Sequence, residues 1–256
     1  MSTEASEASE ASQVNGAGKA AMAAALKVSG LRAGYGQTPI LQGIDLDLRR
    51  GEIVSIIGRN GVGKTTILRC LMGQLPASQG TVEFQGQDIT RLSPDGRARL
   101  GIGYVPQGRE VFPRLTVAEN LSVGRLVGGS RGRKLDDLVY RYFPKLRERE
   151  RQLAGTMSGG EQQQLAIGRA LIGNPALILL DEPSEGIQPS IVQGICETLK
   201  AIRDELGSTI LFVEQNLDTI MALSERAYVV EKGRVVRHVG PDEVRDAEVV
   251  RRSLMI

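Results

Sequence analysis

The sequence predicts a mixed α/β fold, in which helices flank a parallel sheet and an antiparallel β region comes first. Residues 28–48 carry short apolar stretches broken by glycines, the pattern of antiparallel strands. Residues 52–57 form a near-continuous apolar run, as in a strand buried on both faces, and a glycine-rich turn joins them to a helical stretch at 64–72. Residues 177–180 and 209–213 are further apolar strands, each followed by acidic or amide side chains. We expect these strand ends to converge on one site.

Length, composition and charge are those of a globular protein. The chain has 256 residues, 41% of them hydrophobic and 24% charged, which is enough apolar material for a buried core. Its 32 basic and 30 acidic residues give a net charge of +2, which argues against a general nucleic-acid-binding protein. No stretch reaches the roughly 18 apolar residues of a membrane-spanning helix. Cys70 and Cys196 stand apart in apolar contexts and are interpreted as buried thiols.

The chain divides into a short tail and a larger ordered region. Residues 1–25 combine a Ser-Glu-Ala repeat with an alanine-rich run, so they are expected to form a disordered tail, with a short amphipathic anchor as the alternative. Glu4, Glu7 and Glu10 argue against a signal peptide. Residues 125–151 contain nine basic and four acidic side chains. We interpret them as a solvated helical arm, and contact with a nucleic acid or an anionic surface is the alternative.

A phosphate-binding loop follows the first buried strand. Residues 58–65 read GRNGVGKT, which fits the Walker A pattern, and they open the helix at 64–72, as that motif requires. Glycines allow backbone N–H groups to face a phosphate, Lys64 reaches the terminal phosphates, and Thr65 ligates Mg²⁺. We therefore expect ATP to contact Gly58, Asn60, Gly61, Gly63, Lys64, Thr65 and Thr66.

Two acids follow the second buried strand. The run at 177–180 leads directly into Asp181 and Glu182. Such a strand delivers a carboxylate to the water shell of the metal in Mg–ATP sites, a role that we assign to Asp181. The side chain of Glu182, one residue on, faces the other way, and Glu182 is the candidate general base for the attacking water. The alternative is that these are two solvated acids at a strand end, and it is less favoured because the same sequence contains a Walker A loop.

A third motif carries a resemblance to a known family. Residues 157–164 read MSGGEQQQ and resemble the signature of ABC transporter ATPases, with Met157 in place of Leu and Glu161 in place of Gln. Ser158, Gly159 and Gly160 would open a helix and form a second anion site. The motif lies 23 residues before Asp181. The resemblance extends from residue 26 to residue 256 and implies a P-loop ABC ATPase core, a RecA-like α/β sheet plus an N-terminal antiparallel β region, with a helical subdomain inserted at about 108–160.

The same resemblance implies roles for further residues. Tyr35 would stack on adenine, and Gln107 would be the Q-loop amide that reaches Mg²⁺ or water. Gln215 stands where most members carry a catalytic switch histidine, and Gln188 replaces the usual aspartate of the D-loop. The only histidine, His238, is expected to be an exposed strand residue. The resemblance thus implies three catalytic residues, Lys64, Glu182 and Gln215, and three metal ligands, Thr65, Gln107 and Asp181.

Two segments narrow the expected function. Residues 108–117 and 181–192 are similar to importers of branched-chain amino acids, amides and urea, and residues 185–189 are most similar to the second ATPase of urea transporters. The resemblance therefore implies a subunit that uses ATP to import urea or short-chain amides. Import of branched-chain amino acids is the alternative. A soluble ABC ATPase without a transport role is the alternative from another class, although only 94 positions separate Lys64 from Ser158, too few for a long coiled coil.

The resemblance also implies partners. These are a companion ABC ATPase in a head-to-tail heterodimer, two integral membrane permease subunits and, indirectly, a periplasmic solute-binding protein, with no nucleic acid. The expected location is the cytoplasmic face of the inner membrane, as a peripheral subunit.

Overall fold

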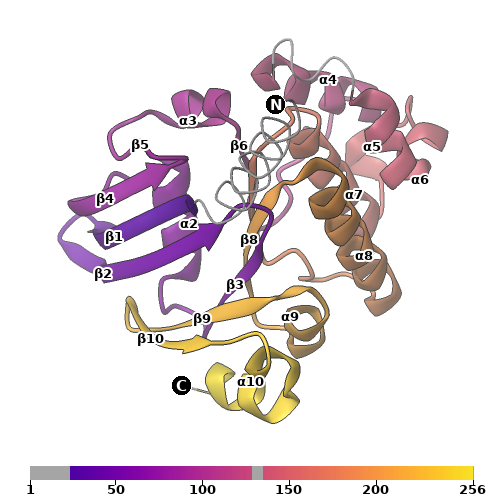
Figure 1. Ribbon diagram of the computed structural model, residues 1–256. Coiled ribbons are helices and arrows are strands. Elements are labelled where there is room, and N and C mark those ends of the chain that lie inside the picture. The colour runs from indigo at the N-terminus through magenta and orange to yellow at the C-terminus, as the bar shows by residue number, and fades with distance from the viewer. Residues whose placement is uncertain (1–23, 129–134, 256) are drawn as a thin grey trace, which may run out of the picture.

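A computed structural model describes residues 24–128 and 135–255 and contains two sheets (Figure 1). The first sheet has the order β2-β1-β4-β5, and its strand pairs are antiparallel. The second has the order β10-β9-β3-β8-β7-β6, with parallel pairs except for β9 and β10. The strands of the first sheet are β1 (Ala24–Tyr35), β2 (Thr38–Arg49), β4 (Gln79–Phe84) and β5 (Gln87–Asp88). Those of the second are β3 (Ile53–Ile57), β6 (Ile102–Val105), β7 (Leu177–Asp181), β8 (Thr209–Glu214), β9 (Arg226–Glu231) and β10 (Arg234–Val239).

The predicted mixed α/β fold is confirmed, including the antiparallel region at the start. β1 begins at Ala24, so the predicted boundary after residue 25 is two residues too late. The reason is packing: Ala25 is buried and its carbonyl accepts a hydrogen bond from Gln85 N at 3.0 Å. The rest of the predicted tail, residues 1–23, lies outside the described residues.

Alternate side chains of the central strands point into two different cores. On β8, Leu211 and Val213 belong to the core around α2 (Lys64–Met72), which lies between the two sheets (Figure 1). Ile210 and Phe212 belong to the core on the opposite face, under α7 (Gly159–Leu171) and α8 (Pro189–Leu206). A strand that is apolar at every position is therefore the consequence of helices on both faces.

The remaining helices surround these cores. α4 (Val117–Gly128) contacts α7 closely, since a Cβ at Gly124 would lie 2.2 Å from the carbonyl oxygen of Arg169. A side chain larger than hydrogen at this position would separate the two helices. Figure 1 shows α4, α5 (Asp136–Tyr142) and α6 (Pro144–Glu148) grouped at one end of the molecule, in the region predicted as the helical subdomain. The further helices are α3 (Pro94–Leu100), α9 (Leu217–Leu223) and α10 (Ala247–Leu254).

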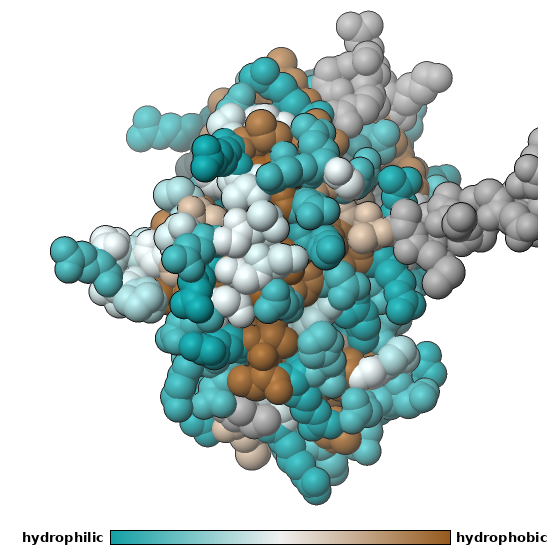
Figure 2. Space-filling view, turned by 60° about the vertical axis from the view of Figure 1, so that its left-hand side comes forward, coloured by the Kyte–Doolittle hydropathy of each residue, from teal (hydrophilic) through white to brown (hydrophobic). Residues whose placement is uncertain are grey.

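The surface shows how little apolar area the fold leaves exposed. On the face in Figure 2, which brings the antiparallel sheet forward, hydrophilic residues dominate and hydrophobic ones form small separate patches. Among residues 24–128 and 135–255, no helix combines the length and the apolar character needed to cross a membrane.

Both cysteines are buried, as predicted, and their thiols are expected to react slowly. Burial raises the pKa of Cys70 to about 12 and that of Cys196 to about 11. At pH 8 the native thiols should therefore react with Ellman's reagent at least ~100-fold more slowly than the same thiols in guanidinium, because the thiolate is the reactive form. The denatured chain, with its two thiols, is the control. Rapid labelling of the native protein would show that these residues are accessible.

Candidate functional site

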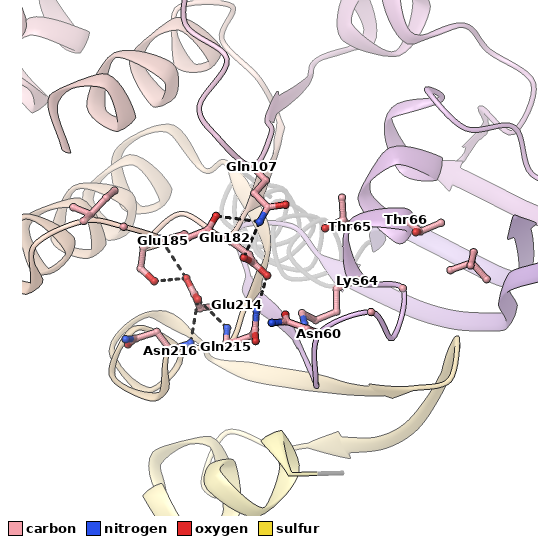
Figure 3. Close-up of a pocket in the computed structure, with 16 residues that line it drawn as sticks. Asn60, Lys64, Thr65, Thr66, Gln107, Glu182, Glu185, Glu214, Gln215 and Asn216 are labelled. Carbon is pink, nitrogen blue, oxygen red and sulfur yellow. Dashed lines mark hydrogen bonds between the residues drawn. The ribbon is translucent and has the colours of Figure 1, made fainter. Parts of the chain in front are cut away.

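A pocket lies at the carboxyl ends of β3, β7 and β8, where the sequence predicted a site. It has a volume of about 740 Å³ (Figure 3). Nine of the predicted site residues line it: Asn60, Gly61, Gly63, Lys64, Thr65, Thr66, Gln107, Glu182 and Gln215. Gly58 and Asp181 contact two of these lining residues, Lys64 and Thr65. The loops after three neighbouring strands thus contribute to a single cavity.

The phosphate-binding loop encloses its own lysine. Lys64 Nζ donates to the carbonyl oxygens of Gly58 and Arg59, both at 2.8 Å. Gly58 has φ 148°, and a Cβ there would lie 2.3 Å from Val230 O, so only glycine fits. Burial lowers the pKa of Lys64, and the nearby carboxylates, led by that of Glu182, oppose this effect. The arrangement presents an ammonium group and the amino end of α2 to the same space, which suits a polyphosphate.

Asp181 and Thr65 form a pair of oxygen ligands. Thr65 Oγ1 donates to Asp181 Oδ1 at 3.0 Å, and the Tyr104 hydroxyl donates to Oδ2 at 3.4 Å. Burial raises the pKa of Asp181 to about 6, against the effect of the hydrogen bond from Thr65. Hydroxyl and carboxylate oxygens are the ligands that Mg²⁺ prefers, and such sites are completed by phosphate oxygens and water. The residues present therefore fit a Mg²⁺ ion bound together with a nucleotide.

The Glu182 carboxylate is held by two amides (Figure 3). Gln215 Nε2 donates to Glu182 Oε1 at 2.7 Å, and Gln107 Nε2 donates to Oε2 at 3.2 Å. Glu182 has φ 49°, a left-handed conformation that is uncommon for residues other than glycine. Because the chain turns here, the Glu182 side chain has hydrogen-bond partners different from those of the Asp181 side chain. A carboxylate fixed on both oxygens but open to the pocket is suited to accept a proton from water.

Several neighbours of these residues were missed by the sequence reasoning. Gln107 Nε2 also donates to Glu185 Oε2 at 3.0 Å, and Arg109 donates to the carbonyl oxygen of Glu185 at 3.0 Å. Glu214, the last residue of β8, is buried in the wall of the pocket. Its position at the end of an apolar strand, like that of Asp181, is a signal in the sequence that points to it.

The predicted signature motif lies outside the pocket. Ser158 is the N-cap of α7 and forms a capping box with Glu161. Ser158 Oγ donates to Glu161 Oε2 at 2.8 Å, and Arg149 pairs with Oε1 at 3.2 Å. Burial favours the neutral form of Glu161, but the hydrogen bonds from Ser158 outweigh it and lower its pKa. Ser158, Gly159 and Gly160 do not line the cavity around Lys64.

Tyr35 is also outside the main pocket. It is 46% exposed and lines a separate, smaller hollow together with Arg69, whose Nη1 donates to the Tyr35 hydroxyl at 3.2 Å. The ring is therefore accessible to a ligand without being part of the cavity around Lys64. His238 is exposed on β10, as predicted, and its ring packs edge-on against Tyr228.

Comparison with known proteins finds one family and many relatives. The family model described as ABC transporter matches residues 41–185. The high-affinity branched-chain amino acid transport ATP-binding protein BraG of Pseudomonas aeruginosa is 46% identical over 80% of this chain and 88% of its own length. The probable branched-chain amino acid transport ATP-binding protein LivF of Archaeoglobus fulgidus is 36% identical over 90% and 98%. The lipopolysaccharide export system ATP-binding protein LptB of Escherichia coli is 34% identical over 90% and 96%.

Two solved structures of ATP-binding cassettes superpose on this chain. A nucleotide-free ATP-binding cassette from an ABC transporter superposes with a TM-score of 0.76 at 27% identity, over 89% of this chain and 97% of that one. A cassette solved in its ADP conformation gives 0.75 at 28% identity, over the same shares of the two chains.

Proposed function

The chain belongs to the ABC transporter family as an ATP-hydrolysing, ATP-binding subunit, and from that premise we propose that it drives import of branched-chain amino acids. The names of two relatives favour this solute over urea or short-chain amides, which the run at 185–189 suggested. The test deletes the gene in its host and measures uptake of labelled leucine and labelled urea. Loss of leucine uptake is expected, and loss of urea uptake alone would restore the interpretation from the sequence.

The pocket supports a division of labour in hydrolysis. In this proposal Lys64 and the backbone N–H groups around Gly61 hold the phosphates. Thr65 and Asp181 would hold Mg²⁺, which would offset charge on the phosphate oxygens. Glu182 takes a proton from water while the water oxygen attacks the γ-phosphorus and the bond to the bridging oxygen breaks, giving ADP and phosphate. The amides of Gln107 and Gln215 orient Glu182, and the amide oxygen of Gln107 would be a further ligand for the metal. The single observation that carries this assignment is the two-amide contact on the Glu182 carboxylate.

The remaining predicted residues complete the nucleotide site in this proposal. Tyr35, in its own hollow, stacks on adenine, as its exposed ring permits. Ser158, Gly159 and Gly160 meet the nucleotide of a companion ATPase, since they do not line the cavity of their own chain. We also propose that the chain binds two membrane permease subunits from the cytoplasmic side, with the helical subdomain at about 108–160 as the contacting part.

A groove beside the Q-loop supports the permease contact. It has a volume of about 290 Å³ and lies between β6, α4 and α7. Phe112, on its edge, is 44% exposed, with the guanidinium of Arg169 4.9 Å from its ring centroid. The buried Asn120 side chain holds the following loop, since it bonds the backbone of Phe112, Leu115 and Thr116. The loop is thus a fixed shape beside Gln107 rather than a free segment.

Charge reversal in that loop is expected to separate transport from hydrolysis. Arg114 is exposed and belongs to the loop held by Asn120. In Arg114→Glu, transport should fall at least ~10-fold, because the reversed charge would face the permease groups that suit an arginine, and like charges across an interface cost several kcal/mol. The ATPase activity of the free chain should stay within about 2-fold. Arg252→Glu on α10 is the matched control and should affect neither activity. Equal loss of transport and ATPase in Arg114→Glu would instead assign this residue to the nucleotide site.

A further inference from the structure

A buried carboxylate joins two loops that border the pocket. Glu214 is only 3% exposed. Its Oε2 accepts hydrogen bonds from Ser184 Oγ at 2.7 Å and from Ser184 N at 3.3 Å. Its Oε1 accepts from Gln215 N at 2.8 Å and from Asn216 N at 3.0 Å (Figure 3). One oxygen therefore serves the loop after β7, and the other serves the loop after β8.

The chemistry of this contact requires a carboxylate. All four partners are donors, and a carboxylate is the side chain that offers two acceptor oxygens and no donor. Hydrogen bonds to an ionised acceptor are stronger than neutral ones, and they offset the cost of burying the charge. The two loops are consequently joined through one side chain that four hydrogen bonds hold in place.

The joined loops carry the residues that contact the catalytic base. Ser184 follows Glu182 by two positions, and Glu185 N donates back to Glu182 O at 3.1 Å. On the other loop, the backbone of Gln215 is fixed by Glu214 while its amide donates to Glu182 Oε1 at 2.7 Å. A path of hydrogen bonds and covalent links thus runs from Ser184 through Glu214 and Gln215 to the Glu182 carboxylate, and the backbone from Glu182 to Ser184 closes it.

We propose that Glu214 is a positioning residue for hydrolysis, which fixes Gln215 against Glu182 and ties both to the loop 184–188. Since Gln188, the N-cap of α8, is exposed at the end of that loop, a second cassette that contacts it would shift Gln215 and the base together. The inference rests on the proposed function in one respect, the assignment of Glu182 as the base.

Glu214→Gln is the informative variant because it breaks one side of the link selectively. The amide oxygen can keep the two N–H groups of Gln215 and Asn216. The amide NH₂ then replaces the oxygen that accepts from Ser184, so the hydrogen bond from Ser184 N is lost, and Ser184 Oγ can stay in contact only by accepting instead of donating. In the full-length chain, kcat for ATP should fall roughly 10- to 100-fold, the scale of a lost charged hydrogen bond, while the Kd of a non-hydrolysable ATP analogue with Mg²⁺ stays within about 2-fold. Glu225→Gln is the matched control, because Glu225 also accepts from a backbone N–H, that of Ile53 at the start of β3. It should lower the unfolding midpoint without changing kcat.

A second variant keeps the test valid if Glu214→Gln does not fold. Ser184→Ala leaves the buried carboxylate in place and removes the 2.7 Å hydrogen bond. It should lower kcat about 3- to 10-fold with unchanged analogue affinity, and in Glu214→Gln it should add no further loss, because both changes break the same link. Wild-type kcat in either folded variant, or equal changes in kcat and Kd, would overturn the inference. If Glu182→Gln itself retains wild-type turnover, the proposed base fails instead.

Discussion

Replacing Glu182 by Gln is expected to slow ATP hydrolysis at least ~100-fold while ATP binding stays nearly unchanged. The amide keeps the size of the side chain but cannot accept the proton of the attacking water. Its NH₂ group would also face one of the two amide donors, Gln107 Nε2 or Gln215 Nε2, that contact the carboxylate in the native protein. Single-turnover hydrolysis and titration with MgATP measure the two effects separately.

Glu185→Gln is the matched control for this prediction. Glu185 is an exposed carboxylate three residues along the same loop, and it accepts from the same Gln107 Nε2 at 3.0 Å. Because it is not the proposed base, its loss should cost less than about 10-fold, the scale of one surface hydrogen bond. Equal rate losses in the two variants would mean that the charge near Gln107, and not proton transfer to Glu182, limits hydrolysis.

Much of the fold could be predicted because local pattern and tertiary packing agree. The helix at 64–72 has the bounds of α2, since its start is set by the glycine turn at 58–63 and its end by Gly73, a left-handed C-cap. The apolar runs at 177–180 and 209–213 became strands, since helices cover both faces of the sheet. The strand at 102–105 was not predicted, because four residues with a glycine at the second position give too short a pattern.

The site was harder to predict because its geometry comes from long-range contacts. The motifs predicted that Lys64, Thr65 and Asp181 lie close together, because the parallel strands β3 and β7 end at the same edge of the sheet. The contact of Gln107 with Glu182 joins residues 75 positions apart in the chain, and that of Glu214 with Ser184 joins residues 30 apart. No periodicity encodes such pairs. They depend on which strand lies beside which, and on the left-handed turn at Glu182.

The signature motif is expected to act at the nucleotide site of another chain. Ser158 opens α7, yet it does not line the cavity around Lys64 of the same chain. In the proposed head-to-tail dimer with a companion ATPase, each nucleotide lies between the phosphate-binding loop of one chain and the signature of the other. Lesions in the two motifs of one chain therefore damage two different sites.

Pairs of lesions distinguish this arrangement from independent subunits. Combining Lys64→Ala here with loss of the corresponding lysine in the companion destroys both sites, so ATPase activity of the complex should fall at least ~100-fold. Combining Ser158→Arg here with the same companion lesion damages only one shared site, because this chain's Lys64 still faces an intact companion signature, and a substantial part of the activity should remain. If each chain hydrolysed ATP alone, Lys64→Ala and Ser158→Arg would give the same result in this background. Full leucine transport by a complex whose only ATPase is this chain would leave the sandwich arrangement standing and replace the companion by a second copy of this chain.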